Sequence, residues 1–131
     1  NLKQNLLNIA FEFFEGDKGK LPILFIHGKG SSKDTWAPVL EKMIGTYPLY
    51  AIDLRGHGMS FYDGADYSME AVVDDIYRFT TNQKLDKFYL VGHSMGGRIS
   101  VPFTAKYPKK VEKLVIEDMD MNPRKVQNLS K

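Results

Sequence analysis

Short apolar runs alternate along the chain with segments of helical periodicity. This alternation predicts an α/β fold with a mainly parallel sheet and helices on both faces. Strands are predicted at residues 8–15, 21–28, 48–53, 87–92 and 111–118. The second run, LPILFIHG, is apolar and ends in glycine, which is typical of a buried strand. Turn-forming residues 16–20 precede it, and the aromatic side chains of Phe11, Phe13, Phe14 and Phe25 are assigned to the core.

Three segments carry apolar residues at helical spacing. The first begins at Thr35, with Ser32 or Asp34 as the N-cap, and its apolar positions are Trp36, Val39, Leu40, Met43 and Ile44. The second has Ser68 as its cap and is marked by Met69, Val72, Val73, Ile76 and Tyr77. The third extends to about Lys106, and Pro102 within it is expected to kink or shorten the helix. No periodic structure is predicted after residue 118.

Composition narrows the functional classes. The 131 residues include 18 Lys+Arg and 16 Asp+Glu, for a net charge of +2. This length supports one core, and the balanced charge argues against a nucleic-acid or membrane-surface binder. The absence of cysteine excludes disulfides, thiolate metal sites and a cysteine nucleophile. Neither a membrane span nor a signal peptide is evident, so a cytoplasmic location is expected.

The central motif is Gly92-His93-Ser94-Met95-Gly96, a G-x-S-x-G pattern between a predicted strand and a predicted helix. A sharp turn there would strain the backbone of Ser94 and expose its hydroxyl, while glycines on either side let chain segments approach closely. The N-terminus of the following helix would stabilise negative charge near that hydroxyl.

Two further segments follow predicted strands. An oxyanion hole needs two N–H donors, and the backbone groups of Met95 and of Lys29, after His27-Gly28, are the candidates. The other segment is DLRGHGMS at residues 53–60, in which Asp53 and Arg55 are interpreted as loop-fixing residues.

With these motifs in order, the chain resembles the α/β-hydrolase fold superfamily over roughly residues 8–120, and is most similar to small microbial esterases. The resemblance implies that its strands are numbers two to six of an eight-stranded sheet and that Ser94 is the nucleophile. Dehalogenases and epoxide hydrolases of this fold have aspartate at that position. Epoxide hydrolases also tend to have proline where Gly30 stands. We therefore expect cleavage of a small carboxylic ester or related acyl substrate.

A serine nucleophile needs a histidine base and an acid to orient it. His27, His57 and His93 all come at or before the serine, and each is expected to have a structural role. The resemblance implies that the base follows the eighth strand. Asp118 and Asp120 are possible acids, because some lipases of this fold place the acid after strand six, although the preferred interpretation is that both are loop carboxylates beside the site.

Residues 1–131 are therefore expected to be the N-terminal portion of a single hydrolase domain, without the cap and the C-terminal strands. The 131 residues alone should show near-background activity. An apolar face and the edge of the last strand would be exposed and could pair with another chain. Neither a cofactor nor a metal is expected.

Two alternatives remain. Residues 28–32 could bind a nucleotide phosphate, but two residues argue against it. Ile23 stands where a Walker A phosphate-binding loop needs glycine, and Lys33 stands where a dinucleotide-binding fingerprint needs its third glycine. The protein could also be a non-catalytic ligand-binding or sensor member of the fold, because a fold does not dictate a function.

Overall fold

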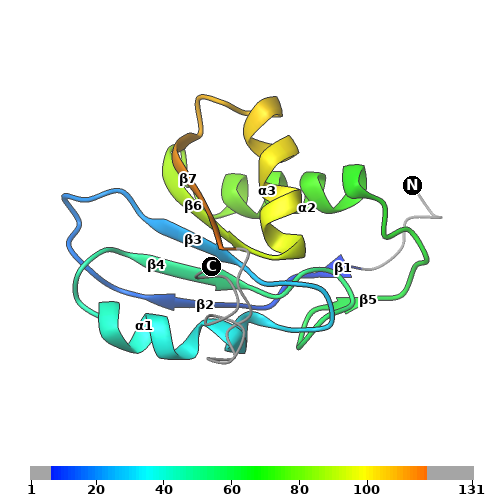
Figure 1. Ribbon diagram of the computed structural model, residues 1–131, viewed down its shortest axis with the longest axis horizontal. Coiled ribbons are helices and arrows are strands. Elements are labelled where there is room, and N and C mark those ends of the chain that lie inside the picture. The colour runs from blue at the N-terminus through cyan, green and yellow to red at the C-terminus, as the bar shows by residue number, and fades with distance from the viewer. Residues whose placement is uncertain (1–6, 118–131) are drawn as a thin grey trace, which may run out of the picture.

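The central sheet dominates the computed structural model, which describes residues 7–117 (Figure 1). Five strands of that range have the spatial order β2-β4-β3-β6-β7. Their bounds are β2 Phe11–Phe14, β3 Ile23–Ile26, β4 Leu49–Ile52, β6 Phe88–His93 and β7 Val111–Glu117. Strand β2 is antiparallel to β4, and the other neighbouring pairs are parallel. The predicted mainly parallel sheet is confirmed.

Helices cover both faces of this sheet, as predicted. Helix α1 (Ala37–Met43) lies on one face, and α2 (Met69–Asn82) and α3 (Met95–Lys106) lie on the other (Figure 1). Side chains of β3 alternate between two buried clusters. Leu24 and Ile26 pack with α2 and α3, whereas Ile23 and Phe25 pack with α1 and the turn that precedes it. Burial on both faces explains why this strand is apolar at every position.

The first predicted strand is wrong in its extent. Residues 8–15 contain parts of two strands with different partners. β1 (Leu7–Asn8) pairs with the short β5 (Phe61–Tyr62), which the sequence analysis missed, and β2 pairs with β4. Between them Ala10 is held by two hydrogen bonds, one from its N–H to Ser60 Oγ (2.7 Å) and one from the Asp53 N–H to its carbonyl oxygen (2.9 Å).

The core assignment of the aromatic residues is correct for Phe25 and wrong for two residues of β2. Phe25 is 2% exposed, but Phe11 and Phe13 are 39% and 44% exposed. Strand β2 lies at an edge of the sheet formed by residues 7–117, and the rings of both residues lie against Tyr50 of the neighbouring strand. These apolar side chains therefore stay partly exposed because their strand lies at the edge of the sheet.

The first helix also differs from its prediction. A 3-10 turn, η1 (Lys33–Trp36), precedes α1, and its cap is Ser32, whose Oγ accepts the N–H of Asp34 at 3.2 Å. Asp34 is therefore inside the turn. The Lys33 N–H donates to buried Asp53 Oδ1 at 2.6 Å, which ties the turn to the end of β4. Ile44 lies beyond the helix and is 55% exposed.

The other two helices agree with the sequence. Ser68 caps α2 by accepting the Ala71 N–H at 3.2 Å. Helix α3 ends at Lys106 with Pro102 inside it, so the proline does not shorten the helix. Among residues 7–117, no helix combines the length and the apolar character that crossing a bilayer requires.

Strand β7 forms the other edge of the five-stranded sheet in the described part of the chain. Val115 and Ile116 on this strand are 52% and 45% exposed, and Val101 of the adjacent α3 is 48% exposed. Apolar side chains are therefore exposed at this edge within residues 7–117. Pairing of this edge with another chain stays a prediction.

Candidate active site

Ser94 occupies the turn between β6 and α3, and its backbone conformation is strained. Its φ of 54° and ψ of −116° are unusual for a residue with a side chain. Its N–H donates to the Glu117 carbonyl oxygen of β7 at 2.9 Å, while its own carbonyl oxygen accepts the N–H groups of Gly97 and Arg98 at 2.9 and 3.1 Å. A strand on one side and a helix on the other therefore hold this conformation.

Two glycines of the motif allow the close packing that this turn requires. A Cβ atom on Gly92 would lie 2.5 Å from the Gly96 carbonyl oxygen. A Cβ atom on Gly96 would overlap the Ile26 carbonyl oxygen and lie 2.6 Å from that of His27. The first turn of α3 is thus packed directly against the end of β3, and no larger residue fits at either position.

The two residues expected to supply the N–H donors line the same pocket. Met95 is the first residue of α3, and Lys29 follows the end of β3. Both line a pocket of about 310 Å³. Within residues 7–117, neither backbone N–H takes part in a hydrogen bond. Both groups therefore remain able to bind a ligand atom.

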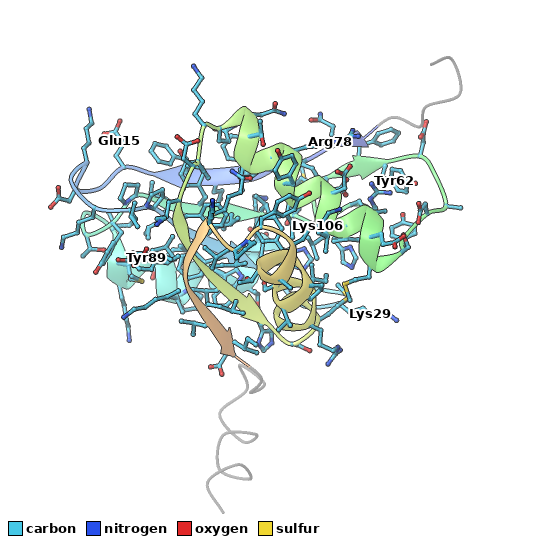
Figure 2. The ribbon with its side chains drawn as sticks, turned by 90° about the horizontal axis from the view of Figure 1, so that it is seen from above. Glu15, Lys29, Tyr62, Arg78, Tyr89 and Lys106 are labelled. Carbon is cyan, nitrogen blue, oxygen red and sulfur yellow. The ribbon has the colours of Figure 1, made fainter. Side chains whose placement is uncertain are left out.

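The pocket is mainly apolar. Besides Lys29 and Met95, its lining consists of Leu54, Arg55, His57, Tyr67, Met69, Val72 and Ile99. Ser94 is the neighbour of Met95 and does not itself belong to this lining. Figure 2 shows Lys29 near the end of α3 that lies opposite Lys106, which is the end where α3 begins.

Arg55 lines the pocket, and each of its three guanidinium nitrogens donates one hydrogen bond. Its Nε and Nη2 donate to Asp75 Oδ2 and Oδ1 of α2 at 2.6 and 2.7 Å, and its Nη1 donates to the Asp66 carbonyl oxygen at 2.7 Å. Its Cζ lies 4.2 Å from the Tyr62 ring centroid. The hydrogen bond to Asp75 is the main reason that the pKa of Arg55 is raised. Arg55 therefore fastens the loop after β4 to α2.

Asp53 is completely buried and fixes the same loop. Its carboxylate accepts the Lys33 and Met59 N–H groups at 2.6 and 2.8 Å and pairs with Lys33 Nζ at 3.1 Å. Burial acts to raise the pKa of Asp53, but these hydrogen bonds outweigh it and the pKa is lowered. The loop-fixing interpretation of Asp53 and Arg55 agrees with these contacts.

All three histidines are engaged with backbone groups. His27 Nδ1 donates to the Gly28 carbonyl oxygen at 2.6 Å, and its Nε2 accepts the Leu54 N–H at 2.9 Å. Burial is the main cause of the lowered pKa of His27, so this ring is neutral and has no free lone pair. His57 Nδ1 donates to the Arg55 carbonyl oxygen, and His93 Nδ1 donates to that of Glu117.

Comparison with known proteins identifies the family of the chain. The sequence model of the α/β hydrolase fold matches residues 22–128. The chain belongs to this family. It is 32% identical over 121 residues to the abhydrolase domain-containing protein abhd-5.2 of Caenorhabditis elegans, covering 86% of this chain and 27% of that protein.

Solved structures of esterases share the fold of this chain. A marine microorganism esterase superposes with a TM-score of 0.80 at 30% identity, over 95% of this chain and 49% of that one. A thermophilic esterase from Thermogutta terrifontis has a TM-score of 0.77 at 27% identity, over 86% of this chain and 44% of that one. The chain thus spans less than half the length of these relatives.

The buried partners of the two loop-fixing residues, Asp75 for Arg55 and Lys33 for Asp53, were not predicted from the sequence. Asp75 is 4% exposed on the apolar face of α2, between Val72 and Ile76. A charged residue at such a position indicates a buried partner and could have been noticed. The sequence around Lys33 gives no comparable indication that this residue has a buried partner. The possible acids Asp118 and Asp120 lie outside the described residues, and no metal-binding cluster of three or more ligands occurs within residues 7–117.

Proposed function

We propose that this chain belongs to a serine hydrolase that cleaves a small carboxylic ester or related acyl substrate through an acyl-enzyme on Ser94. The observation that carries the proposal is the strained turn at Ser94 beside the unpaired N–H groups of Met95 and Lys29. Oriented donors of this kind stabilise the oxyanion of a tetrahedral intermediate. The esterases among the relatives support the same reaction class.

The proposed reaction has two steps. Ser94 Oγ forms a bond to the carbonyl carbon of the ester while a base takes the hydroxyl proton, and the negative charge moves to the carbonyl oxygen. The N–H groups of Met95 and Lys29 bind that oxygen. The carbonyl then re-forms, and the bond to the alcohol breaks as the alcohol oxygen receives the proton. Water repeats the sequence on the acyl-enzyme and releases the acid.

The proposal takes the base from outside residues 7–117. His27 has no free nitrogen, and His93 is directed toward β7 through its bond to Glu117. His57 Nδ1 bonds the Arg55 carbonyl oxygen, and within residues 7–117 its ring forms no hydrogen bond with Ser94. Asp118 and Asp120 remain candidates for the acid, and a cytoplasmic location remains a prediction.

A fluorophosphonate probe tests this proposal on the full-length protein. We expect a stoichiometric adduct, which peptide mass spectrometry assigns to Ser94, and we expect none on Ser94→Ala. Hydrolysis of p-nitrophenyl butyrate should be lost in the same variant. The variant should retain its circular dichroism spectrum, which separates lost chemistry from lost structure.

A non-catalytic ligand-binding protein is the second candidate function. It is favoured by one observation: within residues 7–117, no histidine forms a hydrogen bond with Ser94. A folded full-length protein whose Ser94 is neither labelled nor able to hydrolyse the ester would support this function and overturn the proposed hydrolase.

A further inference from the structure

Lys29 is a basic residue in the lining of the pocket. Its side chain is exposed, and within residues 7–117 no carboxylate forms an ion pair with it. None of the residues that line the pocket is acidic. The other cation in the lining, Arg55, is neutralised by Asp75. The pocket therefore has apolar walls and one cation that is available to a ligand.

Such a pocket favours a ligand with two parts. Apolar walls bind a hydrocarbon segment, because its transfer from water is favourable. The Lys29 ammonium gains most from an anionic oxygen, since next to apolar side chains a charge interaction is screened less than in bulk water. A neutral acyl chain would use only the first of these interactions.

We propose that this pocket selects esters whose acyl chain carries an anionic group, and that Lys29 Nζ binds the anion. A short dicarboxylic half-ester is the simplest such substrate. The inference rests on the proposed function, which assigns the Lys29 N–H to the ester carbonyl oxygen. Because the same residue carries its ammonium on a four-carbon stem, the anion would lie only a few carbons from that carbonyl.

Two esters of equal chain length test the preference on the full-length protein. The readout is the ratio of kcat/KM for p-nitrophenyl hydrogen glutarate to that for p-nitrophenyl valerate, after the spontaneous rates are subtracted. Intramolecular attack by the carboxylate raises the spontaneous rate of the glutarate ester. We expect the ratio to fall about five- to tenfold in Lys29→Met, which keeps the stem, and to be retained in Lys29→Arg.

The ratio separates the role of the side chain from that of its backbone. A disturbed Lys29 N–H would slow both esters by the same factor and leave the ratio unchanged, whereas loss of the ammonium lowers the ratio. With the unsubstituted protein, the ratio of kcat/KM for the glutarate ester to that for the valerate ester should also fall as the salt concentration is raised. Lys42→Met is the control, because Lys42 is exposed on α1 and outside the pocket. An unchanged ratio in Lys29→Met, with both esters hydrolysed, would overturn the inference.

A binding measurement makes the inference independent of catalysis. Monomethyl glutarate and methyl valerate are titrated into the Ser94→Ala protein, followed by backbone amide chemical shifts. We expect tighter binding of the glutarate ester and loss of that preference when Lys29→Met is added. Preferential binding without hydrolysis by the unsubstituted protein would contradict the proposed function alone. Equal binding of both esters would contradict the inference alone.

Discussion

Gly28 lies in contact with Ser94. A Cβ atom on Gly28 would sit 3.2 Å from Ser94 Cβ and 3.2 Å from the His93 carbonyl oxygen. The loop that carries Lys29 is therefore positioned directly by the turn that carries the proposed nucleophile. Any change in this contact alters the distance between the hydroxyl and one of the proposed N–H donors.

Gly28→Ala should therefore impair activity more than stability. A contact at 3.2 Å requires a shift of a few tenths of an ångström, which is enough to misalign a donor, so we expect kcat to fall about tenfold. Steady-state kinetics and urea denaturation measure the two effects. Gly45→Ala is the control: Gly45 has φ +87° and no atom within 4 Å, so it should lose about 1 kcal/mol of stability and keep kcat. Equal kcat values in the two variants would contradict this role of Gly28.

The backbone strain at Ser94 should be measurable as stability. Ser94→Gly relieves a conformation that costs a residue with a side chain on the order of 1–3 kcal/mol, whereas Ser94→Ala retains it. Glycine also raises the conformational entropy of the unfolded chain, which offsets part of this gain. We therefore expect Ser94→Gly to be more stable than Ser94→Ala by about 1 kcal/mol. Chemical denaturation compares them directly. If Ser94→Ala were the more stable variant, the conformation of this turn would be unstrained.

Two adjacent glycines of α3 should respond differently to alanine. Both substitutions improve helix propensity by about 1 kcal/mol. A Cβ atom on Gly96 meets two backbone carbonyl oxygens of β3, which cannot move away, so Gly96→Ala should lose about 2–4 kcal/mol. A Cβ atom on Gly97 meets the side chain of Ile116 at 2.7 Å, and that side chain is 45% exposed and can rotate. Thermal unfolding should therefore find Gly97→Ala close to the unsubstituted protein.

The buried pair of Arg55 and Asp75 should be far more sensitive than a surface pair. Arg55→Lys cannot make both bonds to Asp75 and leaves that buried carboxylate poorly paired, with an expected loss of about 2–4 kcal/mol. Arg78→Lys is the matched control, because its bond to Asp74 is made by side chains that are 70% and 44% exposed. Urea denaturation should show a loss below about 0.5 kcal/mol for the control. Similar losses in both variants would argue against the fastening role of Arg55.

Asp53 should make the free energy of unfolding depend on pH in the acidic range. Its pKa is lowered in the folded protein, so its contribution to stability is complete above the pKa of an exposed aspartate, about 4, and is lost as pH falls through the lower folded value. Asp53→Asn should thus be destabilised at neutral pH, and the difference should shrink below about pH 4. Denaturation curves from pH 7 to pH 2.5 measure this trend. Asp86→Asn, at an exposed position, should show no such convergence, and a constant difference for Asp53→Asn would contradict the assignment.

Local patterns in the sequence were sufficient to predict most of the strands and helices. Apolar runs that are buried on both faces indicated the parallel strands, and Ser68 marked the start of α2 because a cap acts within a few residues. The glycines around Ser94 predicted a sharp turn, since close packing of backbone admits no side chain there.

Contacts between distant segments could not be predicted in this way. The first strand is divided because Ala10 bonds to Ser60 and Asp53, and the 3-10 turn begins at Lys33 because its N–H reaches Asp53. The exposure of Phe11 depends on the place of β2 at the edge, which the residue itself does not encode.

The sequence alone determined the alternation of strands and helices and the strained turn at Ser94, because periodicity, capping and glycine spacing act over short stretches of chain. Only the tertiary structure decided that Lys29 and Met95 line one pocket, that Arg55 is neutralised by Asp75, and that no histidine of residues 7–117 is without a backbone partner. These relationships depend on hydrogen bonds and packing between segments far apart in the chain, and their partners are selected by the folded geometry as a whole.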